Sequence, residues 1–361
     1  MNKSLLKTII LIIFLTLLSL TLMGCKPPTG PRPTLPYTET PTSTPPPINT
    51  ADQTSTPRPT HSPTPEALGY ASNPIVMGFI QSEHSTTQKD AADALAEYLS
   101  NKTSQNVIAR FFLNYKRAEK ALQAGSLHMV WLGPIEYLLV SEQPLATAAL
   151  ITNHFGVTAY GIQFLAHKDF GFTLYFDIGQ NQSIVNMNTA LAQLAGTRPC
   201  FTEENSLAAY LVPKGMLLEA SVPTLDPIMT YSSTASIRAL YVQGICDFGV
   251  TYALSGDPRT ASAVIQDFPD VLDRVQIIWQ SDGIIPNLSL AYSPLLSLPI
   301  QEQISEALIT LSKTTDGQTT LSNANDYSIE GLQRTDDTPY DTLRALLAIQ
   351  NVDLYSLIDN E

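Results

Sequence analysis

The chain has 361 residues, of which 44% are hydrophobic and only 15% are charged, so it carries enough apolar material for one or two domains with proper cores. Acidic residues outnumber basic ones by 33 to 20, and the sequence contains no cluster or stripe of Lys and Arg. Because phosphate backbones are bound by clustered cations, this balance excludes nucleic acid as an expected partner.

The first 24 residues have the order of a secretory signal. Lys3 and Lys7 precede an apolar run, and small residues lead to Cys25. This ending resembles the bacterial lipobox, in which the cysteine receives lipid and becomes the mature N-terminus. We therefore expect a signal peptide at 1–24 and a protein held by lipid on Cys25 at the extracytoplasmic face of the cell membrane. An uncleaved membrane anchor is the alternative, but the apolar run is short for a span.

The next segment, 25–72, changes abruptly to Pro, Thr and Ser and holds half of the 26 prolines of the chain. Such a composition cannot bury a core, and its prolines favour extended polyproline II. We expect a semi-stiff stalk that could hold the folded part on the order of 100 Å from the bilayer, at about 3.1 Å per residue. The Thr density permits O-glycosylation, which the sequence does not test.

The folded part begins near Asn73 with alternating strands and helices. Ser85-Thr86-Thr87-Gln88 fits a capping box that opens a helix, Gly125 fits a left-handed helix cap, and Pro134 fits the first turn of a helix. In chain order, the expected elements are a strand at 75–80, a helix from 85 to about 100, a strand at 107–112, a helix at 115–124, a strand at 128–132 and a helix from 134.

The same alternation returns after the midpoint. The expected elements are a strand at 160–167, a helix at 188–194, a strand at 199–202, a helix at 206–218, a helix at 232–242 and a strand at 245–251. Alternation of this kind predicts α/β units with parallel strands rather than a helical bundle or a sandwich. In such sheets, ligands bind beyond the carboxyl ends of the strands, where helix N-termini offer free N–H groups.

Five stretches follow one another across almost all of the folded region: 75–83 (IVMGFIQSE), 115–134 (YKRAEKALQAGSLHMVWLGP), 200–213 (CFTEENSLAAYLVP), 239–249 (ALYVQGICDFG) and 278–286 (IWQSDGIIP). In their order and spacing they resemble the phosphonate and phosphite substrate-binding proteins of ABC importers. The resemblance implies an α/β protein with the two-lobed type II periplasmic-binding-protein fold, a hinge and an interlobe cleft. It also implies a first lobe of 73–165 and 252–361 and a second lobe of 166–251.

The resemblance and the predicted helix starts together mark candidate ligand-binding residues. The first ligand loop of the family corresponds to Gln81, Ser82 and Glu83, and an aspartate facing the cleft corresponds to Asp247. Tyrosines near the predicted strand ends are further candidates for the cleft wall, although a tyrosine at helical spacing is more often part of a packed surface. The remaining candidates are Tyr115, Gly133, Pro134, Tyr137, Ser206, Thr234 and Tyr252.

The chain departs from the family pattern where that family grips phosphonate oxygens. In place of a Ser-Thr-Ser-Gly turn it has Ser206-Leu207-Ala208-Ala209, and Thr234 stands where the family has a histidine. Each hydrogen bond to an anionic group contributes roughly 1.5 to 3 kcal/mol, so the missing donors argue against a tight phosphonate site. The overall negative charge mildly favours a neutral or cationic solute.

Enzymatic and metal chemistry have little support in the sequence. It has no Gly-rich phosphate loop, no Gly-x-Ser-x-Gly elbow and no His-Glu-x-x-His, and its five histidines include no short-spaced pair. We therefore expect no enzyme, no cofactor and no bound metal. Cys200 and Cys246 fall on strands that could be neighbours, and the sequence leaves open whether they form a disulfide or two buried thiols.

These observations predict a lipid-anchored binding protein that delivers a small molecule, phosphonate-like by resemblance, to the permease and ATPase of an ABC importer. Two alternatives use the same fold. One is a ligand-sensing lipoprotein that serves a membrane kinase, and the other is a structural descendant that binds nothing.

Overall fold

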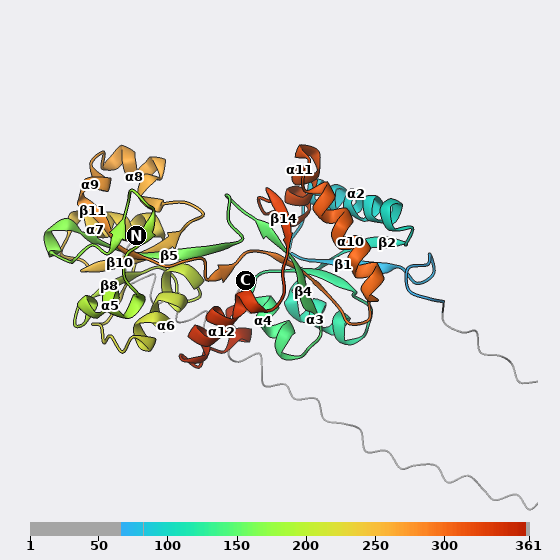
Figure 1. Ribbon diagram of the computed structural model, residues 1–361, viewed down its shortest axis with the longest axis horizontal. Coiled ribbons are helices and arrows are strands. Elements are labelled where there is room, and N and C mark those ends of the chain that lie inside the picture. Colours follow the sequence, from blue (N-terminus) through green and yellow to red (C-terminus); the bar gives the residue numbers. More distant parts are fainter. Residues whose placement is uncertain (1–65, 82, 359–361) are drawn as a thin grey trace, which may run out of the picture. The chain divides into compact units, whose positions relative to one another are not determined.

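The computed structural model describes residues 66–81 and 83–358, which form one compact unit from residue 63 onward. The predicted signal peptide, Cys25, most of the stalk and Ser82 lie outside the described residues. Two sheets, each flanked by helices, organise the described part (Figure 1), so the predicted two-lobed α/β fold is confirmed. No helix within the described residues is long and apolar enough to cross a membrane.

The first sheet has six strands in the order β14-β4-β13-β3-β1-β2. The strands are β1 (Ile75–Ile80), β2 (Val107–Phe112), β3 (Met129–Leu132), β4 (Thr147–Asn153), β13 (Ser289–Tyr292) and β14 (Gly331–Arg334). Its helices are α2 (Thr86–Thr103), α3 (Tyr115–Gln123), α4 (Pro134–Glu142), α10 (Leu298–Leu311) and α11 (Thr315–Asn325).

Side chains of β1 alternate between two buried clusters, as a strand covered on both faces requires. Ile75, Met77 and Phe79 pack in a cluster with α2, α10 and α11, whereas Val76 belongs to the cluster that contains α3 and α4. Figure 1 accordingly shows α2 and α10 on one side of this sheet and α3 and α4 on the other.

Local signals predicted these helices correctly. The Ser85 hydroxyl accepts from the Gln88 N–H at 3.1 Å, and the Gln88 side chain accepts from the Ser85 N–H, which completes the predicted capping box. Gly125 has a φ of 68°, a left-handed value that glycine adopts without strain. The predicted order of strands and helices from residue 75 to residue 142 is therefore confirmed.

The second sheet has the order β11-β5-β10-β8-β9, with β12 (Ile285–Pro286) also paired to β5. Its strands are β5 (Ala159–His167), β8 (Pro199–Phe201), β9 (Ile228–Met229), β10 (Phe248–Ala253) and β11 (Val275–Gln280). The surrounding helices are α5 (Met187–Leu191), α6 (Val212–Glu219), α7 (Ser233–Val242), α8 (Ser262–Asp267) and α9 (Val271–Arg274), and a small hairpin joins β6 (Phe176–Asp177) to β7 (Gln182–Ser183).

A disulfide links Cys200 in β8 to Cys246, which precedes β10, and this settles the choice that the sequence left open. Both cysteines are buried in the cluster that α7, α8 and α9 form with one face of the sheet. The bridge ties β8 to the segment that enters its parallel neighbour β10. An oxidising compartment is where such a bond persists.

Both sheets are mixed, which corrects the expectation of parallel units throughout. The pairs β1–β2, β1–β3, β10–β8 and β8–β9 are parallel, whereas β13, β14, β5 and β11 pair antiparallel with their neighbours. The antiparallel strands are those on which the chain passes from one sheet to the other or returns. Their partners are distant in sequence, so no local pattern predicts their direction.

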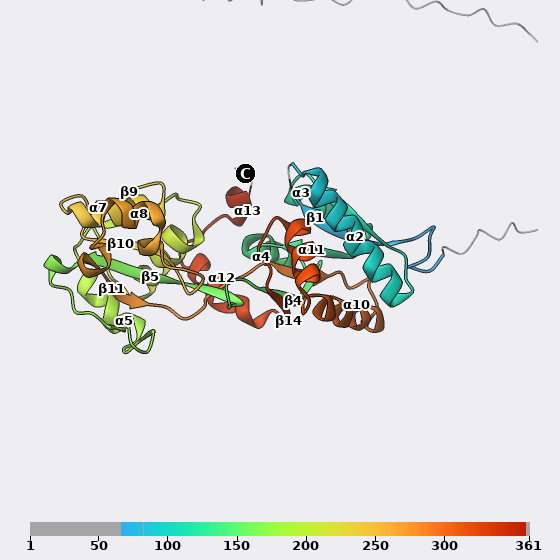
Figure 2. The ribbon, with the colours of Figure 1, turned by 90° about the horizontal axis from the view of Figure 1, so that it is seen from above.

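The resemblance implies that the chain returns to the first lobe at Tyr252, but in the structure the return comes later. Strand β11 pairs with β5 from Val275 to Gln280, so residues 252–280 stay with the second sheet. The chain passes from the first sheet to the second at β5 and returns after β11, and these two segments run side by side. A Cβ atom on Gly161 of β5 would lie 2.8 Å from the carbonyl oxygens of Ser281 and Asp282, which follow β11. Figure 2 shows β5 as the long strand that reaches from the second sheet toward β4.

The C-terminal segment makes a third connection between the sheets. After β14, helix α12 (Asp341–Ala348) packs on α6, where the carbonyl of Leu346 lies 2.7 Å from the position of a Cβ on Gly215. Helix α13 (Leu354–Ile358) then packs on α4, and the Tyr355 hydroxyl donates to Glu119 at 2.6 Å. One buried cluster consequently joins α3 and α4 to α5 and α6 through α12.

Candidate functional site

A cavity of about 410 Å³ is lined by residues from strands and loops of the second sheet and by residues from segments that adjoin the first sheet. The loop after β4, the start of β5, the helix start at Ser206, the end of β10 and the segment after α11 all contribute. The lining residues are His154, Phe155, Tyr160, Ser206, Leu207, Ala208, Tyr252, Ser255 and Tyr327. Its volume is in the range of pockets that bind small molecules.

Aromatic rings form much of the wall of this cavity. The imidazole of His154 stacks on the ring of Tyr327 with centroids 4.4 Å apart, and it lies 4.3 Å from the ring of Phe155. His154 Nδ1 lies 2.7 Å from the carbonyl oxygen of Ser328, and because a carbonyl only accepts, Nδ1 carries the proton and donates. This hydrogen bond fixes the ring orientation next to Tyr327.

Two phenols of the wall stay protonated near neutral pH. Burial raises the pKa of Tyr160 to about 12, and burial together with the neighbouring Tyr160 raises the pKa of Tyr327 further still. Both hydroxyls are therefore neutral groups that can donate or accept a hydrogen bond. Neither supplies charge to a ligand.

The helix start at Ser206 faces the cavity with polar backbone. The Ser206 hydroxyl accepts from the Ala209 N–H at 3.2 Å, and a π-helical turn, Leu207–Leu211, leads directly into α6. The N–H groups of Leu207 and Ala208 belong to the first turn, so they have no partner inside the helix. They can donate to a solute in the cavity.

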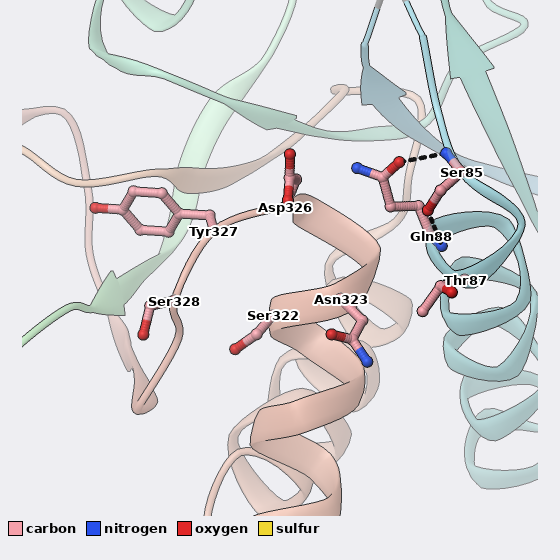
Figure 3. A pocket seen from close by; sticks show the side chains of 8 residues that line it. All are labelled: Ser85, Thr87, Gln88, Ser322, Asn323, Asp326, Tyr327 and Ser328. Carbon is pink, nitrogen blue, oxygen red and sulfur yellow. Dashed lines mark hydrogen bonds between the residues drawn. The ribbon is translucent and has the colours of Figure 1, made fainter.

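A second, more polar cavity of about 520 Å³ shares Tyr327 with the first one. Figure 3 shows Thr87 on α2 and Asn323 on α11 facing each other across it, while the ring of Tyr327 points away from α2. Its lining residues are Ser85, Thr87, Gln88, Ser322, Asn323, Asp326, Tyr327 and Ser328. Asp326 supplies the only charge in this lining.

Two predicted site residues, Gln81 and Tyr115, line a smaller cavity of about 190 Å³ on the first-sheet side. Within the described residues, the Gln81 Oε1 atom and the Tyr115 hydroxyl are buried without a hydrogen-bond partner. Burial and then the nearby Glu119 raise the pKa of Tyr115, so its hydroxyl is neutral. Ile358 of α13 also lines this cavity and limits its size.

The predicted site residues thus separate into groups. Ser206 and Tyr252 line the 410 Å³ cavity, and their contact with a solute stays a prediction. Glu83 is exposed, and Thr234 lies in the first turn of α7. Neither residue lines one of the three cavities described above.

Other predicted residues have structural partners. Tyr137 is buried, donates its hydroxyl to Asp337 at 3.0 Å and accepts from the Ala148 N–H, and its contact with a solute stays a prediction. Asp247 accepts from the Arg198 N–H at 2.7 Å, so its carboxylate fixes a strand entry. The helix start at Gly133-Pro134 opens α4 and has the Glu136 carboxylate folded over it.

The aromatic wall was not identified from sequence. The sequence offers His154 only as one of five histidines without a short-spaced partner, and it does not single out Phe155, Tyr160 or Tyr327. Only their position in the chain could have indicated a role in binding. Each lies in or beside a loop near a strand or helix end, where binding residues concentrate. Within the described residues, no group of three His, Cys, Asp or Glu comes together as a metal site would require.

The fold and the cavity define a two-lobed α/β binding protein with a pocket between its sheets. Comparison with known proteins identifies the family. Residues 77–340 match the family described as "ABC transporter, phosphonate, periplasmic substrate-binding protein", and the chain belongs to this family. Because the family consists of substrate-binding proteins of transporters, the expectation that the chain is not an enzyme is confirmed.

A curated relative is the phosphate-import protein PhnD of Mycolicibacterium smegmatis, which is 22% identical over 223 residues. The match covers 58% of this chain and 63% of the length of that relative. Among solved structures, XAC2383 of Xanthomonas citri bound to chloride is 14% identical, with a TM-score of 0.50, and the match covers 80% of this chain and 99% of that one.

Transferrin 1 of Manduca sexta also has a similar structure, with 10% identity and a TM-score of 0.52. That match covers 80% of this chain and 47% of the transferrin. At these identities the two structures show the fold alone.

Proposed function

We propose that this chain is the extracytoplasmic solute-binding component of an ABC importer and that it binds a small solute in the 410 Å³ cavity. The observation that carries the proposal is the origin of the lining residues. Tyr252 and Ser206 come from the second-sheet region, whereas His154 and Tyr327 adjoin the first sheet, so a solute bound there contacts both. A ligand that contacts two lobes can favour their closed arrangement.

The local chemistry of the cavity supports solute binding. It offers hydroxyl groups, helix-start N–H groups and aromatic surface, which together provide both polar and apolar contacts. The family description and the name of the mycobacterial relative refer to phosphonate and phosphate. In this chain the nine lining residues include no Lys or Arg to pair with an anion. We therefore include phosphonates among the solutes to be tested and do not assign them as the solute.

Thermal unfolding of the purified full chain tests solute binding. A solute at a hundredfold above its dissociation constant stabilises the folded state by about 2.7 kcal/mol and raises the unfolding midpoint. The panel includes phosphonates, phosphite, phosphate, sulfonates, carboxylates, nucleosides, thiamine precursors and organic ammonium salts. At least one compound is expected to raise the midpoint, and a flat response to every compound would contradict the proposed function.

The proposal includes a lipid anchor on Cys25 and a delivery role at the permease and ATPase of an importer. The lipobox-like ending of the apolar segment, followed by a Pro- and Thr-rich stretch, supports the anchor. Substituting Cys25→Ala is expected to move the protein from the membrane fraction to the soluble fraction. Membrane binding at the wild-type level would contradict lipidation at this position.

A further inference from the structure

The charge of the cavity lining restricts the chemistry of its ligand. None of its nine residues is Lys, Arg, Asp or Glu, and five of the nine carry aromatic rings. An anion would find hydroxyl and N–H dipoles there but no cationic side chain to pair with. The face of an aromatic ring carries negative potential and attracts a cation instead.

A carboxylate lies directly behind the loop that carries His154 and Phe155. The Glu330 Oε2 atom accepts from the Gly156 N–H at 2.9 Å, which holds this carboxylate against the loop. Glu330 has no ion-pair partner among the side chains that the structure describes. Its negative charge therefore remains uncompensated beside the aromatic wall.

Further carboxylates adjoin other parts of the lining. Asp326 directly precedes Tyr327 and lines the neighbouring polar cavity, and the exposed Glu203 and Glu204 lie three and two residues before Ser206. Within the described part of the chain, none of these three acids forms a salt bridge either. Aromatic surface and uncompensated negative charge thus occur together around one cavity.

We propose that the 410 Å³ cavity recognises a small organic cation, an alkylated ammonium group held against the faces of its aromatic rings. This inference rests on the proposed solute-binding function and names the class of solute. Alkyl substituents on the ammonium would contact the rings, and the surrounding carboxylates would favour the positive charge. The Ser206 hydroxyl and the adjacent N–H groups remain available for a polar tail of the same solute.

Calorimetric titration of the full chain at pH 8 tests the charge requirement. The probes are tetramethylammonium, choline, methylphosphonate and 3,3-dimethyl-1-butanol, the uncharged carbon isostere of choline. Ionic strength is matched with sodium chloride. Choline or tetramethylammonium is expected to bind at least tenfold more tightly than the isostere, and methylphosphonate is expected to bind more weakly than either cation.

Matched variants then locate the cation. Tyr252→Leu is expected to weaken cation binding about tenfold or more, whereas Tyr252→Phe keeps the ring and changes it little. Tyr70→Leu removes an exposed ring outside the cavity and is expected to have no effect. Glu330→Gln keeps an oxygen that can accept from Gly156 and removes the charge, so a severalfold loss is expected for choline and none for the isostere.

Two results of the titrations with the wild-type protein would overturn the inference while leaving the proposed function intact. One is binding of the isostere as tight as that of choline, and the other is a lack of response to both cations while another solute of the panel binds. If no compound binds, the solute-binding function itself fails. Cation binding that Tyr252→Leu leaves unchanged would also overturn the inference, because the cation would then lie elsewhere.

Discussion

The two sheets of this protein are stabilised in different ways. The first is covered on both faces by helices, among them the 18-residue α2, whose residues Leu95 and Leu99 are completely buried. The second has very short strands β8 and β9, and it relies on the Cys200–Cys246 disulfide together with the ion pair of Arg259 and Asp257. Burial stabilises both regions, and in the second the disulfide adds a covalent cross-link to it.

Removing the disulfide is expected to have the largest effect on stability. The bridge closes a loop with a sequence separation of 46, and chain entropy predicts about 4 kcal/mol for a loop of that length. The Cys200→Ala/Cys246→Ala variant should lose this amount in denaturant unfolding. Reductant should reproduce the loss in the wild type and leave the variant unchanged, and a variant as stable as the wild type would remove the contrast between the two regions.

A substitution that creates a cavity in the core of the first region provides the matching test of burial. Leu95→Ala removes buried methyl groups between α2 and the sheet and is expected to cost about 3 kcal/mol. Leu225→Ala, at a side chain that is 47% exposed, serves as the control and should change the free energy of unfolding little. Equal effects of the two substitutions in denaturant unfolding would contradict the role assigned to this core.

The C-terminal segment that joins the regions can be loosened at one glycine. A Cβ atom on Gly215 would lie 2.7 Å from the Leu346 carbonyl oxygen and 2.9 Å from the Gln350 side-chain nitrogen, so Gly215→Ala should force α12 away from α6. Overpacking of this kind costs about 2 kcal/mol. Hydrogen exchange in α12 should accelerate, whereas Glu219→Ala on the same helix should not accelerate it. An unchanged rate of hydrogen exchange in α12 would contradict the prediction, because α6 and α12 would then accommodate the added methyl group without loss of stability.

The smallest effect concerns acid stability in the first region. His128 is buried, and its Nδ1 accepts from the Val76 N–H at 3.0 Å. Burial, assisted by the charge of Arg110, lowers the pKa of His128 below its ordinary value of 6.5. The unfolded chain then takes up this proton first, so the stabilising contribution is complete above pH 6.5 and decreases as the pH falls toward the folded-state pKa.

His128→Asn keeps an acceptor for Val76 but does not titrate. Its free energy of unfolding should therefore fall less steeply than that of the wild type between pH 6.5 and 5, by at most about 1.4 kcal/mol per pH unit. Identical slopes for wild type and His128→Asn would contradict the assignment.

Sequence predicted what local signals encode. The helix that starts at Ser85 and the cap at Gly125 were predicted because a few neighbouring residues determine them. The pairing of β11 with β5 was missed because it joins strands about a hundred residues apart. In the site, Ser206 was found through its helix start, whereas Tyr327 reaches the cavity only through the packing of α11.

Hydrogen exchange of the full chain with and without the first solute that raises the unfolding midpoint tests the central claim most directly. That claim is that one cavity between the two sheets binds the solute. The account predicts protection in segments of both regions, at 154–160 and 327–328 as well as at 206–209 and 252–255. Protection confined to one region, or located outside these segments, would contradict it.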